Sequence, residues 1–169
     1  MKRHNILNIL TATLLGFAVL SANAAAQQKS LKEQLVGAWT LVSSEITDKD
    51  GTKQPDFGSN PKGVLIFDAS GKYAQLLEQP GRLKFKAREN LRRDTPAEEY
   101  GEAARGYAAA FGTWSVNEAD KTLIRLIEGS LIPNAEGREV KASVSVADGE
   151  LKLSGTASNG VKVDQLWKR

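Results

Sequence analysis

Hydrophobic and polar residues alternate over most of the chain after residue 37, as expected for strands that bury one face. The alternation is cleanest at 138–146, where Val140, Ala142, Val144 and Val146 share one face and polar or charged residues occupy the other. The remaining segments with strand character are 39–47, 64–67, 72–78, 111–116, 121–128, 151–154 and 161–168. The pattern therefore predicts about eight strands.

Short turns separate most of these segments, through the pairs Asp-Gly, Ser-Gly and Asn-Gly at 50–51, 70–71, 148–149 and 159–160. Tight turns make sequential strands antiparallel neighbours. A meander of eight such strands closes naturally into a barrel that can hold one small ligand. We predict an all-β fold, an eight-stranded antiparallel up-and-down barrel, with a two-sheet sandwich as the structural alternative.

Two helices are expected beside the strands. The S-x-x-E spacing at 30–33 is that of a capping box, and it predicts a short N-terminal helix that Gly37 ends. Thr95 as N-cap, Pro96 at the first helical position and Glu98 predict a second helix, inserted between the third and fourth strands. Its apolar stripe, expected to pack against the core, includes Tyr100, Tyr107 and Phe111.

The first 26 residues have the three-part pattern of a secretory signal peptide. Two basic residues precede an apolar run at 6–20, and small residues then fit the A-x-A rule for cleavage after Ala24 or Ala26. The run is shorter than the roughly 18–20 residues of a membrane-spanning helix. We expect removal of 1–26, which leaves one domain at 27–169, periplasmic or secreted, without a membrane span.

Composition excludes several classes of chemistry. The chain has no Cys, and its single histidine, His4, lies in the expected signal peptide. A thiolate nucleophile, a His-containing triad and a His- or Cys-ligated metal are therefore excluded from the mature domain. The signal also carries two of the three net positive charges, so the remainder is close to neutral and does not indicate nucleic-acid binding. We expect no cofactor and no metal, and the balance is against an enzyme.

The sequence resembles a known pattern at both ends of the domain. Gly37 and Trp39 open the first strand after the short helix, and Trp167 and Arg169 share one face of the last strand. This is similar to lipocalins, in which a late arginine packs across the tryptophan of a Gly-x-Trp. The chain resembles the bacterial lipocalin-like domain family, in order, at 35–43, 50–51, 60–67 with Gly71, 107–116, 131–134 and 166–169.

The resemblance implies a barrel with a generic capacity for ligands, and it implies that these four residues form a structural seal at the barrel base. It also has departures. The strand at 122–128 often carries a histidine in that family, whereas Arg125 stands here, and the arginine common after the Pro-Asn loop is replaced by Lys141 or Ala142. A site that used those positions would differ in this protein.

Four residues are candidates for contact with a ligand: Tyr73, Trp114, Arg125 and Gln165. Gln165 shares a face with Trp167, but the pattern leaves open whether Tyr73 and Arg125 point inward. An inward Arg125 would require a partner, either an acid such as Glu78 or Glu128 or an anionic ligand.

Three functions follow as hypotheses. The first is binding of a small apolar or amphipathic molecule inside the barrel. The second is a barrel filled by side chains that acts as a structural or interaction module. The third is an isomerase- or cyclase-type enzyme that uses a tyrosine and a carboxylate. A contiguous cavity distinguishes the first from the second, and an inward carboxylate near a tyrosine in that cavity would favour the third.

Overall fold

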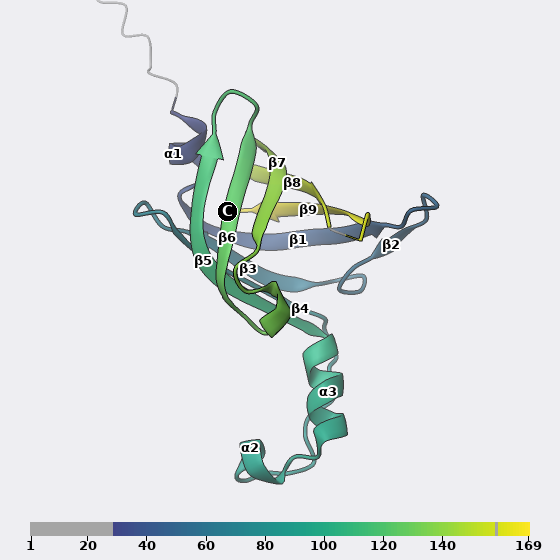
Figure 1. Ribbon diagram of the computed structural model, residues 1–169. Coiled ribbons are helices and arrows are strands. Elements are labelled where there is room, and N and C mark those ends of the chain that lie inside the picture. The colour runs from purple at the N-terminus through teal and green to yellow at the C-terminus, as the bar shows by residue number, and fades with distance from the viewer. Residues whose placement is uncertain (1–28, 158) are drawn as a thin grey trace, which may run out of the picture.

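The alternating segments form antiparallel strands that close into a barrel. The computed structural model describes residues 29–157 and 159–169. Its sheet runs in the order β2-β1-β3-β4-β5-β6-β7-β8-β9, and β1 also pairs with β9 (Figure 1). The strands are β1 Gly37–Thr47, β2 Lys53–Pro55, β3 Lys62–Phe67, β4 Lys72–Glu78, β5 Tyr107–Asn117, β6 Thr122–Ser130, β7 Glu139–Ala147, β8 Glu150–Thr156 and β9 Lys162–Lys168.

The predicted eight-stranded up-and-down barrel is confirmed, because β1 and β3 to β9 close through the β1–β9 pairing, and closure rules out the sandwich. β2 is a ninth, short strand that the hydrophobic pattern did not predict. It pairs with residues 45–47 of β1, on the edge where β3 pairs with residues 37–40. β2 therefore extends the barrel wall past the point at which β3 leaves β1.

One end of the barrel is filled by large apolar side chains. Trp39, Trp167, Phe67 and Leu65 are essentially inaccessible to solvent there. The short helix α1 Leu31–Leu35 covers this end and buries Leu31 and Leu35. The capping box predicted at 30–33 is present, with the backbone N–H of Glu33 donating to the Ser30 hydroxyl. We refer to this end as the closed end.

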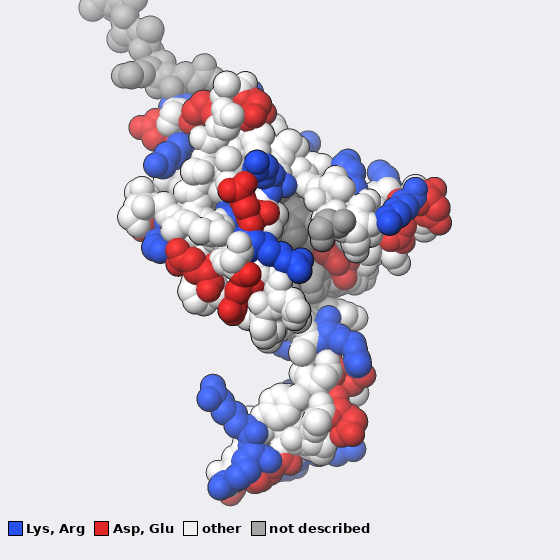
Figure 2. All heavy atoms as spheres, in the orientation of Figure 1, with Lys and Arg blue, Asp and Glu red and all other residues white. Residues whose placement is uncertain are grey.

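An arm of residues 79–106 joins β4 to β5 and projects from the other, open end (Figure 1). It contains α2 Leu91–Asp94 and α3 Ala97–Arg105. Acidic and basic side chains are interspersed over the visible face of the barrel, and basic side chains are prominent at the far end of the arm (Figure 2). None of the helices in the described residues is long and apolar enough to cross a membrane.

The inserted helix differs from its prediction at both ends. The residue before a proline avoids the helical region, and Thr95 is extended, with its hydroxyl enclosed and unbonded, so the helix starts one residue after Pro96 without a capping box. The helix also ends before Tyr107 and Phe111, which belong to β5. Tyr100 packs on Phe85 within the arm, and α3 buries no residue. The expectation that this helix packs against the core is therefore wrong.

We expect Trp39→Ala to lower the free energy of unfolding by about 3–5 kcal/mol, the range for truncating a buried aromatic residue. Trp39 is fully buried, and its Nε1 donates to the Leu35 carbonyl at 2.8 Å. Urea denaturation would measure the loss. Leu83→Ala is the control, because Leu83 is 87% exposed and its truncation should change stability little. Similar stability of the two variants would contradict the assignment of Trp39 to the core.

Candidate functional site

The open end of the barrel contains a pocket of about 700 Å³. The ladder between β7 and β8 ends at the pair of Ser143 and Ser154, so β7 continues toward the open end paired only with β6. The pocket lies against this stretch. Its lining combines side chains of the barrel interior with residues of the rim, namely Gln75, Leu77, Arg125, Ile127, Ala135, Arg138, Glu139, Val140, Lys141, Ala142, Leu153, Gly155, Thr156, Ala157, Val163 and Gln165.

The wall of this pocket is mainly apolar where it lies inside the barrel. Leu77, Ile127, Val140, Leu153 and Val163 come from five different strands and surround the space. Ligand pockets in proteins are typically about 300–1,000 Å³, mostly apolar, with a few placed polar groups that fix the orientation of the ligand. This pocket fits that description in both size and lining.

A line of hydrogen-bonded polar side chains crosses the barrel interior beneath the pocket. Arg125 Nη1 donates to Gln75 Oε1 at 2.5 Å, and Gln75 Nε2 donates to Gln165 Oε1 at 3.2 Å. Gln165 Nε2 then donates to Ser44 Oγ at 3.3 Å, and Ser44 Oγ donates to Asp56 Oδ2 at 3.2 Å. We call these five residues the polar line.

The polar line has a fixed direction because of the chemistry at its two ends. A guanidinium only donates hydrogen bonds and an ionised carboxylate only accepts them. Arg125 therefore holds the oxygen of Gln75 toward itself, and Asp56 draws the Ser44 hydroxyl proton toward its own oxygen. Each glutamine accepts on one side and donates on the other, so the line holds the guanidinium in one position.

Arg125 lacks a carboxylate partner among the described residues. The two acids considered as partners pair elsewhere: Glu128 with Lys72 at 3.0 Å and Glu78 with Arg82 at 3.6 Å. Arg125 Nε is enclosed without a hydrogen-bond partner, and the guanidinium lies 5.7 Å from the ring centre of Tyr73. Burial lowers the pKa of Arg125, an effect that Tyr73 opposes, but an arginine in a protein stays charged near neutral pH.

The four candidate residues fall into two groups. Arg125 and Gln165 line the pocket and belong to the polar line. Tyr73 and Trp114 point into the barrel but lie in the core. The ring centres of Trp114 and Phe67 are 4.8 Å apart, and Trp114 Nε1 donates to the Asp68 carbonyl at 3.0 Å. The structure thus places Tyr73 beside Arg125 and Trp114 opposite Arg125 on the neighbouring strand, and both residues lie outside the pocket lining.

Gln75, Ser44 and Asp56 were not among the candidates. Gln75 could have been found, because it shares one face of β4 with Tyr73 and Leu77. Ser44 could not, because regular alternation from Trp39 and Leu41 points Ser43 inward. An irregularity in the pairing of β1 with β9 shifts the register between Leu41 and Ser43, and Ser44 is buried instead.

The four residues expected at the barrel base lie together at the closed end. The Arg169 guanidinium stacks 4.3 Å from the ring centre of Trp39 and donates to the carbonyls of Gln34 and Val36. Gly37 has a φ of +127°, and an added Cβ there would lie 3.7 Å from Arg169 Nη1. Trp167 is fully buried, and the next residue of β9, Lys168, pairs with Thr40 of β1. This arrangement ties the C-terminus to α1 and β1.

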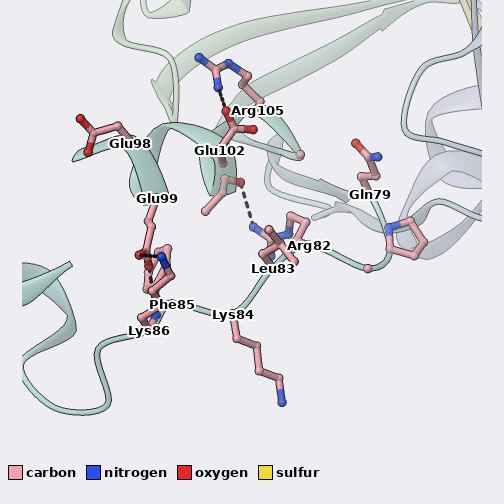
Figure 3. Close-up of a pocket in the computed structure, with 14 residues that line it drawn as sticks. Gln79, Arg82, Leu83, Lys84, Phe85, Lys86, Glu98, Glu99, Glu102 and Arg105 are labelled. Atoms are coloured by element: carbon pink, nitrogen blue, oxygen red, sulfur yellow. Dashed lines mark hydrogen bonds and ion pairs between the residues drawn. The ribbon is translucent and has the colours of Figure 1, made fainter. Parts of the chain in front are cut away.

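A smaller pocket of about 400 Å³ lies within the arm, between α3 and residues 79–86 (Figure 3). Its charged side chains engage one another: Lys86 pairs with Glu99 at 3.8 Å, and Arg105 pairs with Glu102. Arg82 reaches the Ala103 carbonyl at 3.1 Å. The open-end pocket is the stronger candidate, because it alone of the two contains a charged group from the barrel interior. Residues 29–157 and 159–169 contain no cluster of side chains suited to hold a metal ion.

Asp56 should make stability depend on pH in an identifiable direction. Burial raises the pKa of the Asp56 carboxyl above its ordinary value of 3.8, although the Ser44 hydrogen bond opposes this. The native state therefore holds the Asp56 proton more tightly than the unfolded state does. The contribution of this proton to the free energy of unfolding is complete below the ordinary pKa, and it is lost as the pH rises through the raised pKa. Asp56→Asn should gain stability relative to the wild type between pH of about 3 and 7.

Urea denaturation of both proteins across this pH range would test the expectation. Asp50→Asn is the control of opposite sign, because a hydrogen bond from the Thr52 backbone lowers the pKa of the exposed Asp50. A stability difference between wild type and Asp56→Asn that stays constant with pH would contradict the burial of this carboxylate.

Several solved structures are similar to this chain at low sequence identity. The chain is similar to a lipocalin-like protein from Bacteroides uniformis (15% identity, TM-score 0.41, covering 80% of this chain and 98% of that one). It is also similar to mFAP1, a redesigned β-barrel bound to DFHBI (14% identity, TM-score 0.42, covering 83% and 100%), and to the fluorescent protein UnaG (18% identity, TM-score 0.38, covering 81% and 96%). No curated protein matches the sequence.

The model of the family described as the lipocalin-like domain matches residues 36–168, well over half of the chain. This match begins at the strand that carries Gly37 and Trp39 and ends in the last strand, as the sequence resemblance indicated. The chain therefore belongs to the lipocalin-like domain family.

Proposed function

We propose that this protein binds a small apolar or amphipathic molecule in the pocket at the open end of its barrel. The observation that carries the proposal is the pocket itself, about 700 Å³ with an apolar wall inside the barrel. The closed end is filled by Trp39, Trp167 and their neighbours, so the barrel is packed at one end and hollow at the other. A hollow end is not needed for a purely structural barrel, which argues against that alternative.

An isomerase or cyclase is less well supported. Such an enzyme would need an acid or base in the pocket. The acidic residue of the lining is Glu139, which is exposed and pairs with Lys141 at 3.2 Å. Asp56 has a raised pKa, but it lies at the outer end of the polar line and does not line the pocket. The arrangement of the lining favours binding over catalysis.

Binding can be tested with the neutral fluorescent dye Nile red and with native mass spectrometry of protein purified without detergent. We expect saturable Nile red binding, and an added mass that is lost on denaturation. Val140→Trp should weaken dye binding on the order of tenfold, about 1.4 kcal/mol, because it fills the pocket.

Leu126→Trp is the matched control, since Leu126 is exposed on the outer face of the neighbouring strand. Thermal unfolding would confirm that both variants fold. If the folded wild type binds no dye and carries no added mass, or if both tryptophans weaken binding equally, the pocket is not a binding site.

We propose in addition that the protein is exported. The support is the sequence of residues 1–26, which lie outside the described part of the chain. N-terminal sequencing of the protein from a periplasmic extract should find a start at Ala25 or Gln27. Recovery of the chain with Met1 intact, in the cytoplasmic fraction only, would contradict export.

A further inference from the structure

Arg125 is a half-buried cation with an enclosed Nε atom, and the described residues provide no carboxylate counter-ion for it. Burying an isolated charge is costly unless the charge is paired and hydrogen-bonded. The described residues offer Arg125 one hydrogen-bond acceptor, the amide oxygen of Gln75, and no carboxylate. A guanidinium has five N–H donors, so most of the capacity of this group is unused.

The guanidinium of Arg125, with its unpaired N–H donors, lies beside the pocket. Arg125 lines the pocket together with Gln75 and Gln165, while its Nε is enclosed by protein. The polar line fixes Gln75 with its oxygen toward Arg125, because the other end of that amide donates to Gln165. The guanidinium is therefore held in place before any ligand arrives, and a prearranged donor loses less entropy on binding.

The rim of the pocket also favours a negative charge. Three basic residues, Arg125, Arg138 and Lys141, line the pocket, against the single acidic residue Glu139. Glu139 and Lys141 pair with each other at 3.2 Å. The remaining charge of the lining is therefore positive, from Arg138 at the rim and Arg125 inside.

The geometry points to an amphipathic organic carboxylate as the ligand of this pocket, with its head group on Arg125 and its apolar part along Leu77, Ile127 and Val163. The planar guanidinium matches the planar carboxylate, and charge-assisted hydrogen bonds of this kind are roughly twice as strong as neutral ones. The apolar wall removes the remainder of the ligand from water. This inference rests on the proposed function, because it names the class of molecule that the same pocket takes.

The experiment is displacement of Nile red by two probes of equal chain length, dodecanoate and dodecanol. At neutral pH, dodecanoate should displace the dye at a concentration lower on the order of tenfold, because only dodecanoate supplies the missing counter-ion. Arg125→Gln should remove this preference while dye binding persists. Arg105→Gln is the matched control, because Arg105 is exposed on α3 and lies outside the pocket.

The comparison of dodecanoate with dodecanol on the wild type tests the carboxylate assignment even if Arg125→Gln does not fold. Equal displacement by the two probes, with dye binding intact, would overturn the carboxylate assignment and leave the proposed function standing. A preference for dodecanoate that survives in folded Arg125→Gln would likewise overturn the assignment to Arg125. Absence of binding by the dye and by both probes would remove the proposed function and this inference together.

Discussion

The backbone pairing between β1 and β9 is the constraint on which the rest of the structure depends. It closes the sheet, and closure removes the unpaired edges that an open sheet would expose. The same pairing sets the interior, because Leu41 faces Trp167 and, after the irregularity, Ser44 faces Gln165. The contact that closes the barrel therefore also joins two members of the polar line.

The interior changes in character along the barrel axis, and three strands show this in the same order. Inward positions run from Leu123 to Arg125 to Ile127 on β6, and β4 and β9 repeat the sequence of apolar, polar and apolar residues. Hydrogen bonds from Arg125 to Gln75 and from Gln75 to Gln165 place these polar residues at one level of the barrel interior. This level separates a filled end, where tryptophans exclude solvent, from a hollow end with an apolar wall. A ligand in the hollow end would contact the polar side chains at the base of the pocket.

The strands were predictable because their signals are local. A period of two in hydrophobicity and a tight turn such as that at Gly71, with φ of +93°, require only neighbouring residues. The predictions failed where another signal competed. The run around Tyr107 and Phe111 has helical spacing, but Gly106 ends the helix and the residues that follow pair with β4. Ladder pairing on both sides of β5 outweighs a local helical preference.

The candidate site was predictable only in part. Arg125 and Gln165 were identified from the face they share with apolar neighbours, and Gln75 could have been found in the same way, whereas the role of Asp56 depends on Ser44, 12 residues away in sequence. The sequence by itself determined eight of the nine strands, their antiparallel order and the absence of cysteine, whereas the β1–β9 pairing decided between a barrel and a sandwich. Only the tertiary structure decided that Arg125 points inward, that the nearby acids pair elsewhere, and that one end is hollow. These depend on the register of closure and on one shifted position in β1, which no local pattern encodes.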